Sequence, residues 1–225
     1  MKVKKAAKIA ALAFLNGIRL HKDSILLFKS HSYPSAYQLS VLAQEEIGKA
    51  FVIEDYIFYY HQNNKLLPKE YEKLLESVFT SHQPKQGAFS KQADESYVSK
   101  GYHKIPKIMK EVSGGLLEVK KQNATYVGLA RKKRRVTFDG KILVPEKFVH
   151  QVTAQRMITR VNDFLLDLCE GFQRGIYAVE TDELEKQLTI PLAQELESRW
   201  SHQKAKSKKR LSKIRTFEIE SVSKS

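Results

Sequence analysis

A stretch of mostly apolar residues runs from about residue 35 to residue 60. At 3.6 residues per turn, one stripe of this stretch consists of Leu39, Ala43, Ile47, Ala50, Ile53 and Ile57. Other sides of the same helix are also apolar, which is typical of a helix enclosed by other helices rather than one lying on a surface. We therefore predict a central helix around which the rest of the chain is organised.

The few polar residues of this central helix are its most informative positions. Glu46 falls within the apolar stripe and Lys49 lies one turn away on its flank, whereas Glu45 points roughly a quarter turn or more away. Glu54 also falls beside the apolar stripe. A carboxylate among core positions is costly unless it is paired, so we expect Glu46 to hold a partner. Gly48 has no side chain, which favours the close approach of another helix.

The same periodicity predicts further helices on either side of the central one. They cover about residues 4–30, 68–83, 105–123, 145–177 and 182–202, the last one interrupted at Pro191, with a loop or a short irregular helix at 86–104. On the first helix, Asn16 and Asp23 lie two turns apart and face the same way as its apolar residues. His82 continues the apolar face of the helix that Pro68 opens, and we expect Pro84 to end that helix.

One segment has the pattern of strands instead. The runs 136–138 and 141–144 flank the pair Asp139-Gly140, which is a strong signal for a hairpin turn, so we predict a small β-hairpin near 135–144. The chain has only six prolines and ten glycines, and strand-like alternation is scarce elsewhere. The predicted fold class is all-α, an antiparallel helical bundle with this one hairpin insertion.

At 225 residues the chain suits one domain, which we expect to span residues 1–202. Residues 203–225 contain too few apolar side chains to pack and are expected to form a disordered basic tail.

The one cysteine, Cys169, excludes an internal disulfide and favours a cytoplasmic location. No apolar run approaches the roughly 18 residues needed to cross a membrane. Because Lys8 interrupts the first apolar patch, we interpret residues 1–18 as an amphipathic helix rather than a signal peptide.

The net charge of +14 is concentrated in two places. The run Arg131, Lys132, Lys133, Arg134 and Arg135 contributes five positive charges, and residues 203–215 carry seven basic residues and no acid. The rest of the chain is nearly neutral. Basic clusters of this kind suit RNA, DNA or an acidic partner, and we take the 131–135 run as the candidate nucleic-acid site. For the tail, a solubilising role is an equally good interpretation.

Four features together resemble the AbiV family of abortive infection proteins. They are Asn16 and Asp23 on the first helix, the run Ala-Gln-Glu-Glu-Ile-Gly-Lys at 43–49, His82-x-x-Lys85, and Tyr126-Val127 followed by Pro145 and a long helix. The resemblance spans about residues 5–180. It implies a HEPN-like helical bundle, a homodimer and a role in antiphage defence.

Many HEPN proteins are metal-independent ribonucleases with an Arg-x4-6-His motif at the dimer interface. None of the seven histidines here has an arginine five to seven residues before it, so ribonuclease activity does not follow from the resemblance. The chain also lacks a Gly-rich phosphate loop, His-Glu-x-x-His and Cys-x-x-Cys. Glu45, Glu46, Glu54 and His82 are metal-binding residue types, but the paired Glu-x-x-His motifs of helical bundles are missing. We therefore expect no metal and no cofactor.

The polar residues that fall on apolar stripes form the candidate catalytic set. Its members are Asn16, Asp23, Glu46, Lys49, His82 and Lys85, with Glu54 nearby. In one interpretation His82 transfers protons, a carboxylate orients it, and Lys49 or Lys85 holds a phosphate. In the other, these residues form a satisfied polar network that fixes helix register or a dimer contact.

Two functions remain open at this level. The first is an effector of antiviral defence that acts on RNA or the translation machinery, by cleavage or by binding. The second is a non-catalytic dimeric interaction module whose effect depends on a phage-encoded or host protein partner. Under either interpretation we expect a homodimer through the first two helices, because the central helix is apolar on more than one side.

Overall fold

The fold was analysed in a computed structural model of the chain. It describes residues 1–63, 69–98, 111–112, 114–129, 131–132, 135–136, 138, 140–173, 175 and 179–200. Among them, no helix is both long enough and apolar enough to span a bilayer. The predicted tail at 203–225 lies outside the described residues.

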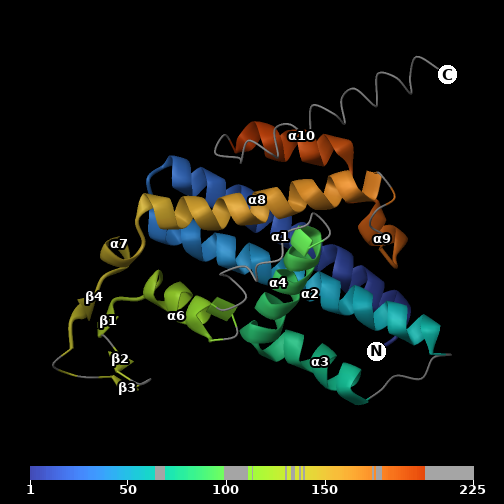
Figure 1. Cartoon of the computed structure of the whole chain (residues 1–225), viewed down its shortest axis with the longest axis horizontal. Helices are drawn as coiled ribbons and strands as arrows, with labels where there is room; N and C mark the ends of the chain where they lie inside the picture. Colours follow the sequence, from blue (N-terminus) through green and yellow to red (C-terminus); the bar gives the residue numbers. More distant parts are fainter. Residues whose placement is uncertain are drawn as a thin grey trace.

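The bundle is built around two long helices, α1 (Val3–Lys29) and α2 (Tyr33–Gln62). The connection between them is only three residues long, so α2 runs back along α1. The helix α8 (Gln151–Gln173) packs along both, and α10 (Ile190–Arg199) covers α8 on its outer side (Figure 1). The short helix α9 (Asp182–Glu185) contacts α1. The predicted all-α class is confirmed.

The opposite side of α2 is covered by shorter helices. They are α3 (Lys69–Thr80), α4 (His82–Val98) and α6 (Leu116–Asn123). The prediction that Pro84 ends a helix was wrong, because α4 begins at His82 and continues through it. Proline is tolerated in a first helical turn, where its missing N–H has no partner to lose. The predicted helix at 105–123 is interrupted at Gly115, which has φ +68° and precedes α6.

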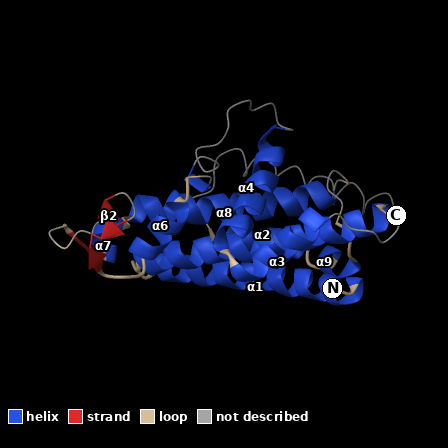
Figure 2. Cartoon of the chain, turned by 90° about the horizontal axis from the view of Figure 1, so that it is seen from below, coloured by secondary structure: helices blue, strands red, loops and turns tan. Residues whose placement is uncertain are grey.

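A small antiparallel ribbon lies at one end of the bundle (Figure 2). Its strands are β1 (Gly128–Leu129), β2 (Arg131–Lys132), β3 (Arg135–Val136) and β4 (Ile142–Leu143). The outer strands β1 and β4 pair with each other, and so do the inner strands β2 and β3. A small antiparallel ribbon is therefore present near the predicted place, but its pairing differs from the prediction. The strand β4 pairs with β1, and β3 pairs with β2, so β3 and β4 are not partners.

The long helix predicted from Pro145 to about Tyr177 is two helices. The short α7 (Pro145–Phe148) ends at Val149, whose φ of −112° and ψ of 106° are extended, and α8 begins at Gln151. Val149 is buried beside Ala154 and Trp200 in a hydrophobic cluster. The break between α7 and α8 therefore lets the side chain of Val149 point into the core.

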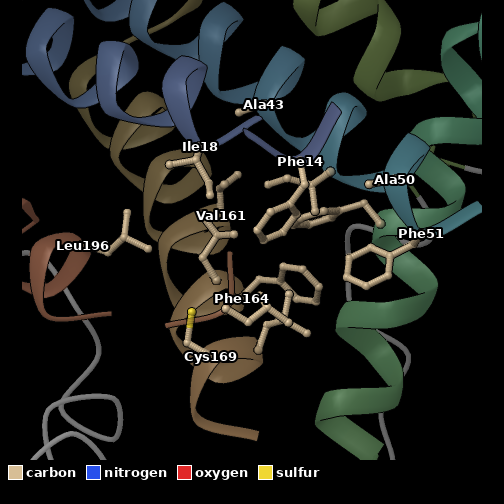
Figure 3. Close-up of a cluster of buried hydrophobic side chains, with 14 of the residues drawn as sticks. Phe14, Ile18, Ala43, Ala50, Phe51, Val161, Phe164, Cys169 and Leu196 are labelled. Carbon is tan, nitrogen blue, oxygen red and sulfur yellow. The ribbon is translucent and has the colours of Figure 1, made fainter. Parts of the chain in front are cut away.

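The core surrounds α2 on nearly all sides, as its pattern predicts. Its largest cluster lies between α1, α2 and α8, where Phe14, Phe51 and Phe164 meet (Figure 3). Cys169 belongs to the same cluster and is buried. Burial raises the pKa of its thiol to about 12, so Cys169 acts as a small apolar side chain and not as a nucleophile.

The sequence predicts one stripe on α1 that includes Leu12, Leu20 and Leu27 together with Asn16 and Asp23, and the buried face of α1 differs from it. Leu12 is 55 % exposed, whereas Phe14 and Ile18 are buried. Asn16 and Asp23 consequently lie at the margin of the contact with α2 instead of inside the core. The stripe was misplaced because alanines at many positions make the apolar face of α1 broad and its centre ambiguous.

Candidate functional site

The candidate residues do not form the single cluster that the sequence predicts. Glu45 and Glu46 are consecutive on α2, and successive helical positions point about 100° apart. Glu46 faces α1, while Glu45 faces α4 and α6. The polar residues are thereby divided between two sides of α2, and Glu54 belongs to a third location.

The first group is the Glu45 cluster, which consists of Glu45, His82, Gln86, Glu118 and Lys121. Glu45 is 2 % exposed. Its Oε2 lies 2.7 Å from Nδ1 of His82, and its Oε1 accepts hydrogen bonds from Gln86 Nε2 at 2.7 Å and Lys121 Nζ at 2.9 Å. Glu45 points to a different side of α2 from Glu46, as its position in the sequence predicts, but this side is also buried. This carboxylate is the centre of the cluster.

His82 is the exposed member of the Glu45 cluster, with 49 % of its side chain accessible. An ionised carboxylate only accepts hydrogen bonds, so Glu45 requires a proton on Nδ1 of His82. In the neutral imidazole, Nε2 is then left as a proton acceptor. A buried carboxylate that fixes the tautomer of a half-exposed histidine is the arrangement that general acid–base catalysis uses.

A lysine joins the two carboxylates of the Glu45 cluster. Lys121 Nζ donates to Glu45 and lies 2.8 Å from Glu118 Oε2. Burial raises the pKa of Glu118, but the hydrogen bond and charge of Lys121 outweigh it, so the pKa lies below its ordinary value. Gln86 Nε2 also lies 3.4 Å from Glu118 Oε2. The two carboxylates, the ammonium and the amide thus form one network on α2, α4 and α6.

Gly48 determines how closely α4 approaches α2. A Cβ at this position would overlap the backbone carbonyl oxygen of Lys85 and lie 3.0 Å from Phe89 N. The close approach predicted from Gly48 is confirmed. Since Glu45 and His82 each precede this crossing point by three residues, the contact at Gly48 places their side chains opposite each other.

The second group is the Glu46 chain, a row of hydrogen bonds between α1 and α2. Lys49 Nζ lies 2.6 Å from Glu46 Oε1, and Asn16 Nδ2 donates to Glu46 Oε2 at 3.1 Å. Arg19 Nη2 donates to Asn16 Oδ1 at 2.9 Å, and its Nη1 bonds Asp23 Oδ2 at 2.9 Å. The prediction that Glu46 holds a partner is confirmed. This row is partly exposed, and its ion pairs are of the modest surface kind.

Glu54 lies apart from both groups. Its carboxylate accepts hydrogen bonds from the backbone N–H of Glu180 at 2.6 Å and from Thr181 Oγ1 at 2.8 Å. Burial raises the pKa of Glu54, although these hydrogen bonds act in the opposite direction. Glu54 lines a cavity of about 120 Å³ together with Phe51, Phe58 and other residues of α2 and α8. We assign it to the attachment of the 179–181 segment.

A layer of buried polar residues separates two hydrophobic clusters of the core. His21 Nε2 lies 3.0 Å from Asn162 Oδ1, and both side chains are fully buried. Burial lowers the pKa of His21 to about 4, so the ring is neutral at physiological pH. This pair could not be predicted from the sequence, because His21 and Asn162 are 141 positions apart.

Lys85 and the basic run 131–135 take part in neither the Glu45 cluster nor the Glu46 chain as far as the structure describes them. Lys85 contributes its backbone to the Gly48 contact, and within the described part of the chain its ammonium has no hydrogen bond or ion pair. The backbone of Arg131, Lys132 and Arg135 forms β2 and β3, whereas the side chains of the 131–135 run lie outside what the structure describes.

Sequence reasoning missed four members of the Glu45 cluster: Glu45 itself, Gln86, Glu118 and Lys121. Glu118 and Lys121 are spaced i, i+3 on one short helix, which is a recognisable ion-pair signal. Their link to Glu45 depends on tertiary packing and had no signal in the sequence.

Comparisons with known proteins agree with this architecture. The family model described as AbiV, with a HEPN-type domain, matches residues 5–166, which is more than half of the chain. All members of the Glu45 cluster and of the Glu46 chain lie within the matched range. Searches of the curated proteins and of the solved structures found no match. The extent of the family match, over a helical bundle of the expected class, shows that the chain belongs to the AbiV family of HEPN-like proteins.

Proposed function

We propose that this protein is an abortive-infection effector that acts on RNA, with His82 as its proton-transfer group. The observation that supports this proposal is the contact between the buried Glu45 carboxylate and Nδ1 of the half-exposed His82. The AbiV family match supports the role in antiphage defence. RNA, either free or in the translation machinery, is the substrate class that suits an exposed proton acceptor such as His82 near lysines.

The chemistry that fits His82 is cleavage of RNA by its own 2′-hydroxyl. His82 Nε2 takes the proton of the 2′-O–H, the 2′-oxygen forms a bond to phosphorus, and the bond to the 5′-oxygen breaks. The imidazolium or a water molecule then protonates the departing 5′-oxygen. Lys85, whose ammonium has no partner within the described residues, would bind the phosphate.

The test is expression in infected and uninfected cells, with RNA integrity and protein synthesis followed over time. His82→Ala should reduce both phage protection and RNA loss by at least tenfold. Its helical content, measured by circular dichroism, should be unchanged. Glu45→Gln should weaken both, because the amide no longer demands a proton on Nδ1. His150→Ala, an exposed histidine outside the site, is the matched control and should behave like the wild type.

Full protection by the folded His82→Ala protein would refute the catalytic role. That result would favour the second interpretation, a non-catalytic module that acts through a phage-encoded or host protein partner. If His82→Ala loses protection although the wild type causes no loss of RNA, the target would be another component of translation and not RNA.

We also propose that the protein acts as a homodimer in the cytoplasm. The support is an exposed apolar row on α1 that includes Leu12, Leu15 and Leu26, at spacings that share one helical face. Light scattering at micromolar concentration should give twice the mass of the chain, and Leu15→Glu should halve it. A monomeric wild-type protein would contradict this assembly.

A further inference from the structure

We propose that Glu45, His82 and Glu118 form a binding site for one divalent transition-metal ion, with Lys121 as a built-in competitor for the same place. The proposal concerns metal binding and does not rest on the proposed action on RNA. It is derived from four features of the Glu45 cluster: the distances between its donor atoms, its charge, the position of Lys121 and the orientation of the Gln86 amide.

The donor atoms are close enough to share an ion. One carboxylate oxygen from each glutamate and one ring nitrogen of His82 all lie within 4.8 Å of one another. Zinc bonds to nitrogen and oxygen are about 2.0–2.2 Å long, so two ligands of one ion lie about 3–4 Å apart. Small side-chain movements suffice to reach this geometry. The three residues come from α2, α4 and α6, and the Gly48 crossing fixes the first two helices relative to each other.

The charges of the cluster suit a doubly charged ion. Two carboxylates face each other, and the one ammonium of Lys121 bonds to both, at 2.9 Å and 2.8 Å. A single ammonium compensates one of the two negative charges, whereas a divalent ion compensates both. Lys121 therefore marks the place where the cluster stabilises a cation. If its flexible side chain turns outward, the same two carboxylates are free to bind the ion.

Gln86 supplies an independent indication of a missing ligand. Its side chain is fully buried and directed into the cluster, where Nε2 donates to Glu45 Oε1. The amide oxygen Oε1 is buried without a hydrogen-bond partner, which is costly. Rotation of the Gln86 side-chain amide by 180° would exchange Nε2 and Oε1. The oxygen would then point into the cluster and could coordinate the ion as a fourth ligand. The two orientations have nearly the same shape.

The ligand set identifies the class of ion. Imidazole favours zinc, cobalt, nickel or copper over magnesium and calcium, and two carboxylates with an amide oxygen add hard oxygen ligands. We therefore expect Zn²⁺ and Co²⁺ to bind well and Mg²⁺ to bind poorly. Coordination through Nδ1 of His82 moves the ring proton to Nε2. If the proposed function is correct, the bound ion would also remove the base that acts on RNA.

The experiment is calorimetric titration of the full chain with Zn²⁺, repeated with Co²⁺ to record its visible absorption. We expect one Zn²⁺ per chain for the wild type. Lys121→Met should bind at least tenfold more tightly, because the competing ammonium is gone. His82→Ala and Glu118→Gln should each bind at least tenfold more weakly. Glu118 is partly exposed, so its replacement by glutamine tests the site with little risk to the fold.

Two matched variants separate this site from adventitious binding. Lys120→Met removes the neighbouring lysine, which pairs with Glu111 at 2.9 Å outside the cluster, and should leave Zn²⁺ affinity unchanged. His150→Ala removes an exposed histidine elsewhere and should also have no effect. The proposal is overturned if Lys121→Met binds no more tightly than the wild type, or if Zn²⁺ affinity is insensitive to His82→Ala in a folded protein. Activity in cells is not needed for either result.

Discussion

At the scale of single residues, Glu45 connects three helices through its one carboxylate. It lies in the interior of α2 and bonds to partners on α4 and α6 at once. Its neighbour Glu46 has a side chain that is 19 % exposed and bonds to Asn16 and Lys49 at the edge of the helix pair. The two adjacent carboxylates therefore differ in what their loss would cost.

We predict that Glu45→Ala destabilises the protein by about 2–4 kcal/mol, because Lys121 and Gln86 lose a buried partner. Glu46→Ala should cost about 1 kcal/mol or less, since its ion pair is partly solvated. Urea unfolding of both variants measures the difference. Equal midpoints would show that the Glu45 cluster contributes no more than the Glu46 chain.

The helical wheel could not distinguish these two glutamates correctly. It identified a stripe on α2 and assigned Glu45 to another side, but α2 is enclosed by helices on nearly all sides. On such a helix, a position away from one apolar stripe is still buried. The partners His82 and Lys121 are 37 and 76 positions away along the chain, so only the tertiary structure could identify them.

His21 predicts how stability depends on pH. Its pKa is about 4 in the folded protein, against an ordinary value of 6.5. Between these values the unfolded chain binds a proton that the folded protein does not, so stability falls as the pH decreases from about 6.5 to about 4. Below about 4 both states are protonated and the loss is complete, at about 3 kcal/mol.

The measurement is unfolding free energy as a function of pH for the wild type and His21→Gln. The variant should lose less stability than the wild type across this range, whatever its stability at neutral pH. The difference between the two pH profiles isolates the contribution of His21. Parallel pH profiles would show that the burial of His21 is not linked to folding.

At the scale of elements, the crossing of α2 and α4 depends on the absence of a side chain at Gly48. Backbone meets backbone at this point, where Lys85 and Phe89 lie against α2. Backbone atoms cannot move aside as the end of a flexible side chain can. Any side chain here must therefore separate the two helices.

We predict that Gly48→Ala destabilises the protein by about 2–3 kcal/mol through overpacking and also weakens the hydrogen bond between Glu45 and His82. Gly87→Ala is the matched control, because a Cβ at Gly87 meets nothing within 4 Å. That change should stabilise α4 by about 0.5–1 kcal/mol. Thermal unfolding should show a lower melting temperature for Gly48→Ala and a higher one for Gly87→Ala. An unchanged melting temperature for Gly48→Ala would contradict the close backbone contact between α2 and α4.

The elements themselves were largely predictable, whereas their interruptions were not. The period of apolar residues located α1 and α2 to within a few residues, because each buries a face with helical spacing. The break at Val149 and the continuation of α4 through Pro84 depend on packing partners distant in the chain. For the ribbon, the Asp139-Gly140 signal was local, but the pairing of Gly128 with Leu143 was not.

At the scale of the whole molecule, the basic ribbon lies at one end of the elongated bundle, beside α7 (Figure 2). The 131–135 run contributes five positive charges to a molecule whose remaining residues, apart from the segment 203–215, are nearly neutral. The described backbone of β2 and β3 places part of this run on an antiparallel ribbon.

We predict that replacing Arg131–Arg135 with glutamine weakens RNA binding and reduces its dependence on salt, because fewer counterions are released from the phosphates. Replacing the exposed Lys2, Lys4, Lys5 and Lys8 is the matched control and should have a smaller effect. Truncation after His202 should weaken binding less than the ribbon substitution does. Fluorescence anisotropy with labelled RNA at several salt concentrations measures all three, and equal affinities would exclude the ribbon as the RNA site.

The consecutive positions of Glu45 and Glu46 also couple the two sides of the bundle mechanically. Both side chains are attached to the same turn of one enclosed helix. A movement of α2 therefore changes its contacts with α1 and its contacts with the pair α4 and α6 at the same time. A rotation of α2 that loosens Glu46 from Asn16 also displaces Glu45 relative to His82. We therefore expect that docking of another chain on α1, if it rotates α2, changes the position of Glu45 relative to His82.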